Sequence, residues 1–154
     1  MTTKIVNQEP GLEPEYIINF DGCSKGNPGP GGSGAVLYHN GIEIWSDSKF
    51  TGAYVTNNVA EYNGLIMGML EASSLSRNIV YLLVKGDSQL IIRQMTGEYK
   101  VKSDNLIILY NEAKRLESKF KKVTYQHVYR NKNVRADKLS NDGLLNKGVS
   151  SIPK

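Results

Sequence analysis

Apolar residues along the chain follow strand-like patterns in five places. Residues 15–23 are rich in β-forming side chains and end at an Asp-Gly pair. Two strand-like runs fill residues 35–50 on either side of His39-Asn40-Gly41, and Asn-Gly is a strong signal for a β-hairpin. Residues 78–85 form a continuous apolar run, which is typical of a strand covered on both faces. A fifth strand is predicted over residues 123–129.

Helical spacing of apolar residues predicts four helices, over residues 58–74, 88–95, 104–120 and 131–145. The elements therefore follow one another in the order βββαβααβα. An antiparallel hairpin combined with later crossover helices predicts an α/β fold, in which a single five-stranded mixed sheet is flanked by helices.

The length of 154 residues suits one domain with a hydrophobic core and is too short for two comfortable ones. Residues 1–14 are polar and without period, which predicts a loose N-terminal leader. We expect the domain to span residues 15–146 and a short tail to occupy residues 147–154. Met1 and the polar leader favour a free-standing protein over a domain cut from a larger polyprotein.

Composition indicates where the protein is located and what kind of partner it binds. The one cysteine, Cys23, cannot form an internal disulfide, and no apolar run approaches the ~18 residues that span a membrane. The N-terminus lacks the apolar region of a signal peptide, so we expect a cytoplasmic protein that does not bind membranes. The net charge of +4 favours an anionic partner, but only weakly.

Four acidic residues stand where chemistry could use them, and each also has a purely structural interpretation. Asp21 could start a turn after the first strand. Glu61 could form a capping box with Asn58, and Asp87 could cap the short helix that follows it. Asp137 could be a solvated residue on a helix face. Taken singly, each structural interpretation is the more common one.

Taken together, the four carboxylates suggest a metal site. In an open sheet, sites form beyond the carboxyl ends of the strands, where Asp21 and Asp87 would meet if their strands are parallel neighbours. Glu61 and Asp137, near the starts of two helices, could point to the same place. Carboxylates that close repel one another unless divalent cations neutralise them, and oxygen ligands favour Mg²⁺ or Mn²⁺ over zinc. Two such ions about 4 Å apart clamp a phosphodiester during hydrolysis.

Four sequence blocks resemble the ordered motifs of the type 1 ribonuclease H family. They are FDGCSKGNPGPGGSGAVLY at 20–38, TNNVAEYNGLIMGMLEA at 56–72, VKGDSQLIIRQMTGEYKVK at 84–102 and RNKNVRADKLSN at 130–141. The similarity covers residues 15–145, and the blocks keep the order and spacing of the family. The resemblance implies that residues 15–146 form a catalytic domain with a ribonuclease H-like fold.

The resemblance also implies an activity. It predicts a monomeric endonuclease that hydrolyses the RNA strand of RNA–DNA hybrids and leaves 5′-phosphate and 3′-hydroxyl ends. Asp21, Glu61, Asp87 and Asp137 would hold two Mg²⁺ ions with substrate, and Mn²⁺ could substitute. Family positions that touch nucleic acid correspond to six residues here: Gly22, Asn27, Thr56, Asn57, Asn58 and Gln89. Amides and hydroxyls of this kind suit the recognition of ribose 2′-OH groups.

Three departures from the family pattern stand out. Residues 97–105 are too short to contain the basic handle of many bacterial members, which suggests the compact archaeal-like and plant-like branch. Val59 replaces an arginine that some members use for a DNA phosphate. The family often uses a mobile histidine for product release, and either His127 or Arg130 could act here. We favour Arg130, because His127 lies inside a predicted strand.

Two further alternatives stay open. A non-catalytic module that only binds hybrids could share the fold, although the intact set of four carboxylates argues against it. Another nuclease of the wider superfamily, such as an exonuclease or an integrase, would lack the Gly-Asn-Pro-Gly turn together with Asp-Ser-Gln.

Overall fold

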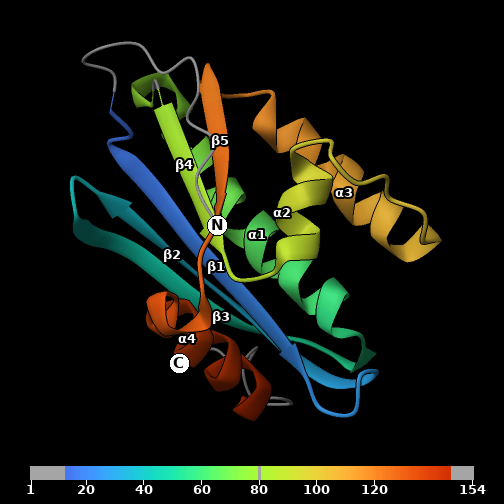
Figure 1. Cartoon of the computed structure of the whole chain (residues 1–154). Coiled ribbons are helices and arrows are strands. Elements are labelled where there is room, and N and C mark those ends of the chain that lie inside the picture. The colour runs from blue at the N-terminus through green and yellow to red at the C-terminus, as the bar shows by residue number, and fades with distance from the viewer. Residues whose placement is uncertain (1–12, 80, 147–154) are drawn as a thin grey trace.

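The computed structural model describes residues 13–79 and 81–146. Its five strands are β1 (Tyr16–Ser24), β2 (Gly29–His39), β3 (Ile42–Val55), β4 (Tyr81–Gly86) and β5 (Lys122–His127). They form one sheet in the order β3-β2-β1-β4-β5 (Figure 1). β1, β2 and β3 pair antiparallel, whereas β4 pairs parallel with both β1 and β5. The predicted five-stranded mixed sheet is therefore confirmed.

Four α-helices complete the predicted element order. They are α1 (Asn57–Ser73), α2 (Gln89–Met95), α3 (Asp104–Glu117) and α4 (Val134–Leu145), accompanied by the short 3-10 helices Ser76–Asn78 and Arg130–Lys132. Figure 1 shows α1, α2 and α3 on one face of the sheet and α4 on the other. None of the helices within the described ranges is long and apolar enough to cross a membrane.

The predicted domain, residues 15–146, nearly coincides with the described part of the chain. Residues 1–12 of the leader and the whole tail at 147–154 lie outside the described residues. The division of the chain into leader, domain and tail therefore stays a prediction.

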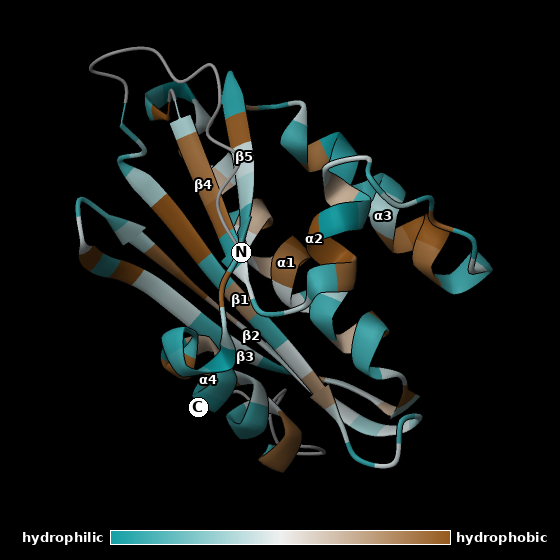
Figure 2. Cartoon of the chain, viewed as in Figure 1, coloured by the Kyte–Doolittle hydropathy of each residue, from teal (hydrophilic) through white to brown (hydrophobic). Residues whose placement is uncertain are grey.

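The main hydrophobic core fills the space between the sheet and the three helices α1 to α3. Its fully buried members include Ile18 and Phe20 from β1 and Tyr62, Leu65 and Met69 from α1. Figure 2 shows β4 as hydrophobic along most of its length, as expected for a central strand covered by helices. Burial of each large apolar side chain contributes roughly 1.5–3 kcal/mol to folding before entropy is counted.

Residues 29–34, which are rich in glycine, form the first part of β2. The sequence pattern did not predict a strand there. β2 begins at Gly29, and α4 lies directly on this part of the strand. A Cβ atom added to Gly34 would lie 2.7 Å from the backbone nitrogen of Ser140 in α4. The glycines therefore serve the packing of a helix against the strand, and tertiary contact overrides their low strand propensity.

Two more glycines bring α1 into backbone contact with β1. A Cβ on Gly22 would lie 2.3 Å from the backbone nitrogen of Glu61, and one on Gly64 would lie 2.4 Å from the carbonyl oxygen of Asp21. No side chain can fit between the two elements at these points. The contact places residues Asp21 and Glu61 next to each other, although they are far apart in the sequence.

We expect Gly64→Ala to destabilise the protein by about 2 kcal/mol or more, because the new methyl group would push against backbone atoms that cannot rotate away. Alanine has the higher helix propensity, so local preference alone would give the opposite sign. Chemical denaturation measures the free energy of unfolding. The matched control is Gly52→Ala in β3, where the added Cβ would meet only a methyl group of Val55. Equal or higher stability of Gly64→Ala would contradict the role given to this contact.

Candidate active site

The parallel register of β1 and β4 brings two aspartates to the same edge. The last paired residues of the two strands are Phe20 and Gly86, so Asp21 and Asp87 each follow that final pair. β1 continues to Ser24 beside β2 alone, and Asp21 is therefore not in a turn. Its Oδ1 accepts a hydrogen bond of 2.8 Å from the backbone nitrogen of Gly22, and the residue is only 5% exposed.

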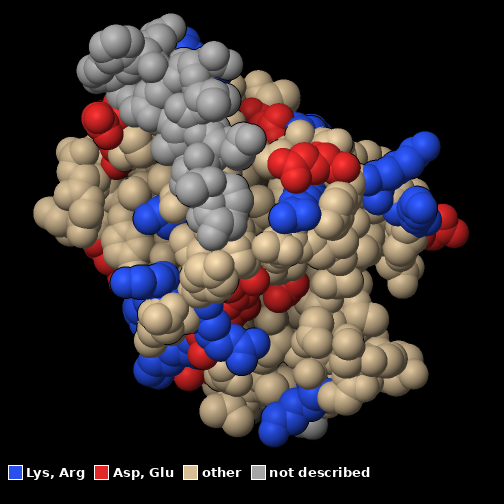
Figure 3. Space-filling view, viewed as in Figure 1, with Lys and Arg blue, Asp and Glu red and all other residues tan. Residues whose placement is uncertain are grey.

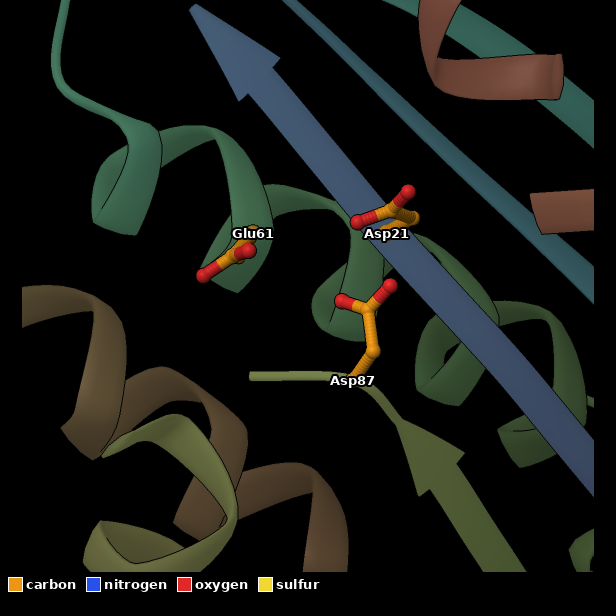
Figure 4. A group of neighbouring side chains, drawn as sticks. All are labelled: Asp21, Glu61 and Asp87. Atoms are coloured by element: carbon orange, nitrogen blue, oxygen red, sulfur yellow. The ribbon is translucent and has the colours of Figure 1, made fainter. Parts of the chain in front are cut away.

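Glu61 completes a cluster of three carboxylates. One carboxylate oxygen from each of Asp21, Glu61 and Asp87 lies within 4.8 Å of the other two. Figure 4 shows the three side chains coming from β1, α1 and the segment after β4, with their carboxylates gathered around one space. The structure thus brings together three of the four acidic residues that the sequence analysis singled out.

Asp137 lies beside this cluster without being one of the three. It stands in the first turn of α4, because that helix begins at Val134 and not at residue 131 as predicted. Its negative charge contributes to the raised pKa of Asp87, and a hydrogen bond with it contributes to the raised pKa of Asp21. Asp137 is half-buried, and its Oδ1 accepts a hydrogen bond of 3.4 Å from Nδ2 of Asn141.

Burial and mutual repulsion favour protons on the cluster. Burial, followed by the charge of Asp87, raises the pKa of Asp21 to about 8. Burial raises the pKa of Glu61 to about 7, although a hydrogen bond with Ser88 opposes the shift. Burial also raises the pKa of Asp87, against the positive charge of Arg130. Protons and cations would therefore compete for the same oxygens.

The donor set suits a hard divalent cation. All three members of the cluster offer carboxylate oxygens, which suit Mg²⁺ or Mn²⁺ better than zinc. Oδ2 of Asp87 is buried and has no hydrogen-bond partner among the described residues. An unpaired buried carboxylate oxygen is costly, and a bound cation would satisfy it. Asp21, Glu61 and Asp87, with Asp137 beside them, are the residues that could hold metal.

The structure assigns the caps of the two helices at the site to other residues. Thr56 is the N-cap of α1, and its Oγ1 accepts a hydrogen bond of 3.2 Å from the nitrogen of Val59. Ser88 is the N-cap of α2 and accepts from Ile91 in the same way. The alternative interpretations of Glu61 and Asp87 as capping residues are therefore wrong.

Most of the predicted substrate-binding residues lie around the start of α1. Oδ1 of Asn27 accepts a hydrogen bond of 2.8 Å from the nitrogen of Asn57 and so ties the glycine-rich turn to this helix. A pocket of about 280 Å³ lies next to them and is lined by Asn27, Thr56, Asn58, Val59, Ser103, Asn105 and Leu106. Gln89 is exposed in the first turn of α2, whereas Gly22 is buried under α1.

Two polar residues of this pocket, Ser103 and Asn105, were not found by the sequence analysis. They lie at the start of α3, in the segment that was considered only as a shortened handle. A serine and an asparagine around a predicted helix start are a weak signal, since both residues are common caps. The sequence alone offered no reason to place them opposite Asn27.

Arg130 and His127 lie in different surroundings. Arg130 is exposed in the 3-10 helix that precedes α4, and its positive charge lowers the pKa of both Glu61 and Asp87 against the effect of burial. His127 ends β5 and packs edge-on against Tyr129, with ring centroids 5.5 Å apart. Its Nδ1 is buried without a hydrogen-bond partner in the described part of the chain.

The charge on this side of the molecule is mixed. Figure 3 shows acidic side chains near the middle of the face and Lys and Arg side chains beside them, over α4. An acidic centre next to basic groups suits a phosphodiester backbone only if cations neutralise the centre.

Comparison with known proteins agrees with this fold and site. A family model described as reverse transcriptase-like matches residues 19–143, which places the chain in that class. A bifunctional protein of Mycobacterium tuberculosis is 42% identical over 131 residues, which are 84% of this chain and 35% of the relative. A ribonuclease H of Pseudomonas savastanoi pv. phaseolicola is 35% identical over 141 residues, which are 80% of this chain and 89% of the relative.

A solved structure extends the comparison. LC11-RNase H1 in complex with an RNA/DNA hybrid superposes with a TM-score of 0.77 at 34% identity, and covers 84% of this chain and 96% of that one. The chain belongs to the type 1 ribonuclease H family, and the predicted ribonuclease H-like fold is confirmed. It spans about a third of the length of the mycobacterial relatives it matches.

The raised pKa of Asp21 makes stability depend on pH when metal is removed. Its folded pKa of about 8 lies above the ordinary value of 3.8, so this group stabilises the fold fully below about pH 4 and loses that effect as pH rises through 8. In chelating buffer we expect the melting temperature to fall between about pH 5 and pH 8. Asp21→Asn should flatten this slope, and Mg²⁺ should reverse it in the unmodified protein.

Thermal denaturation of both proteins, with chelator and with Mg²⁺, measures these slopes. The control is Asp47→Asn, which removes an exposed carboxylate on β3 outside the cluster. If Asp21→Asn and Asp47→Asn show the same pH slope, the protonation of the cluster does not limit stability.

Proposed function

We propose that the chain is an endonuclease that hydrolyses the RNA strand of RNA–DNA hybrids with two Mg²⁺ ions, leaving 5′-phosphate and 3′-hydroxyl ends. The observation that carries this proposal is the carboxylate cluster of Asp21, Glu61 and Asp87 at the end of two parallel strands. Two relatives support the choice of substrate: a ribonuclease H at 35% identity and an RNase H1 solved with an RNA/DNA hybrid.

The chain's own residues have two tasks in this reaction. The carboxylates of Asp21, Glu61 and Asp87, with Asp137 beside them, would hold the cations, and the close contact of β1 with α1 fixes the positions of Asp21 and Glu61. When bound, the ions activate a water molecule and stabilise the charge that develops on the phosphate. Asp21, Glu61 and Asp137 lie within β1, α1 and α4, and Asp87 directly follows β4, so the spacing of the site is set mainly by how these elements pack.

The polar pocket beside the cluster suits the two strands of a hybrid. Asn27, Asn57, Asn58 and Gln89 offer amides that can hydrogen-bond to ribose 2′-OH groups. Thr56 and Asn105 line the pocket with neutral hydrogen-bonding groups, which suit a phosphate of the DNA strand. Val59 also lines this pocket where some relatives carry arginine, so the phosphate would be held by hydrogen bonds and not by a charge.

The decisive experiment offers the protein labelled RNA–DNA hybrid, RNA–RNA duplex and DNA–DNA duplex, each with Mg²⁺ and with chelator. We expect cleavage of the RNA strand of the hybrid with Mg²⁺, and none with chelator. Asp87→Asn should lower the rate by several orders of magnitude with little change in stability, because Ser88 caps α2. Asp47→Asn, which changes the same charge on the surface, should cleave like the unmodified protein.

Binding of the hybrid without any cleavage would show a binding module instead of an enzyme. Cleavage of DNA–DNA duplex at the same rate would point to another nuclease of the superfamily. Sensitivity of the labelled product ends to phosphatase checks the predicted 5′-phosphate.

We also propose that Arg130 assists the release of the cleaved strand. Arg130 is exposed and its charge acts on two carboxylates of the cluster, whereas the His127 ring packs against Tyr129. A permanent positive charge there can attract the new 5′-phosphate away from the cations. We expect Arg130→Ala to lower steady-state turnover well below the single-turnover rate, and His127→Ala mainly to affect stability.

Rates with enzyme in excess and with substrate in excess separate cleavage from release. The assignment is reversed if His127→Ala slows only multiple turnover while Arg130→Ala leaves it unchanged. A histidine in this role would also make turnover fall above roughly pH 6.5, where the imidazole loses its charge.

A further inference from the structure

Asn133 is a fully buried polar residue at the junction between the last 3-10 helix and α4. None of its surface is exposed, and it occupies the N-cap position of α4. Asparagine at that position usually accepts a hydrogen bond from the first turn of the helix, but the side chain of Asn133 makes no such bond. The usual explanation for an asparagine here therefore does not apply.

The side chain points into the sheet instead. Its Nδ2 donates a hydrogen bond of 2.9 Å to the carbonyl oxygen of Phe20, a residue 113 positions away in the sequence. Phe20 immediately precedes Asp21 and is the last residue of β1 that pairs with β4. This bond holds the start of α4 against the strand at the point where the carboxylate cluster begins.

Asn133 also contacts the segments that carry two other carboxylates. A hydrogen bond from its side chain lowers the pKa of Asp87 against the larger effect of burial. Its backbone carbonyl accepts a hydrogen bond of 3.0 Å from the nitrogen of Asp137. Asn133 thus interacts with the chain beside Asp21, with the side chain of Asp87 and with the backbone of Asp137.

Two buried polar atoms near the carboxylate cluster lack hydrogen-bond partners within residues 13–79 and 81–146, which lowers the stability of the fold. Oδ1 of Asn133 is buried without a hydrogen-bond partner among the described residues, and so is Oδ2 of Asp87. A buried polar atom left unpaired destabilises a fold. Two such atoms on neighbouring side chains at the carboxylate cluster indicate a site arranged for ligand binding at the expense of stability.

We propose that Asn133 is a positioning residue for the cation site. It acts through Asp87 and through the carbonyl of Phe20, and it sets how far Asp87 and Asp137 stand from Asp21. Its consequence for cleavage rests on the proposed function, whereas its effect on cation binding does not. Residues that orient metal ligands from outside typically change metal affinity by 10- to 100-fold when they are replaced.

The test is a Mn²⁺ titration of the free protein, followed by calorimetry or electron paramagnetic resonance. We expect Asn133→Leu to weaken Mn²⁺ binding by about 10-fold or more, because the leucine keeps the volume but not the amide. Asn133→Ser retains one small hydrogen-bonding group, so its Mn²⁺ affinity should lie between those of the unmodified protein and the leucine variant. It also provides a second variant if the leucine protein does not fold. If hybrid cleavage is observed, the Mg²⁺ concentration for half-maximal rate should rise by the same factor.

The matched control is Gln94→Leu. Gln94 is a second buried amide, but it bonds the hydroxyl of Tyr62 in the core at 2.7 Å, away from the cluster. This control should lower the melting temperature and leave Mn²⁺ affinity unchanged. The proposal is overturned if both Asn133 variants bind Mn²⁺ within about twofold of the unmodified protein, or if Gln94→Leu loses as much affinity. Loss of Mn²⁺ affinity in a protein that cleaves no hybrid would leave this inference standing and refute the proposed function.

Discussion

Backbone contact between α1 and β1 determines where the acidic centre of the molecule lies. At Gly22 and Gly64 the two elements approach so closely that a single methyl group would not fit. The approach sets Glu61 beside Asp21, and the register of β1 with β4 then adds Asp87 at the same edge. The cluster is thus a result of how the layers pack. Its repulsion and its desolvation are opposed by the hydrophobic core behind it.

Much of this arrangement could be predicted because it depends on repeating patterns. Hydrophobic periodicity indicated the five strands and four α-helices of the described residues in the right order, and the convergence of Asp21 with Asp87 followed from two parallel strands that end together. The four family motifs added the identity of the fold. These signals are robust, since each is spread over many residues or follows from topology.

What could not be predicted depends on single tertiary contacts. Gly34 belongs to a strand because α4 lies against it, and no local preference of glycine indicates this. Ser88, and not Asp87, caps α2, although both residue types cap helices well. Asn133 falls inside the helix predicted over residues 131–145, and only the fold shows that its side chain is buried and directed at β1.

The hydrogen bond from Asn133 to Phe20 joins residues that are far apart in the sequence, and this separation matters while the chain is being synthesised. It joins positions 113 residues apart, and α4 contributes the last of the four acidic residues. A ribosome that has released only the first three-quarters of the chain has therefore produced three of the carboxylates without the segment that braces them. We therefore expect no chemistry at this centre before α4 has been synthesised and packed against β1, so a chain that stops before α4 would be inert.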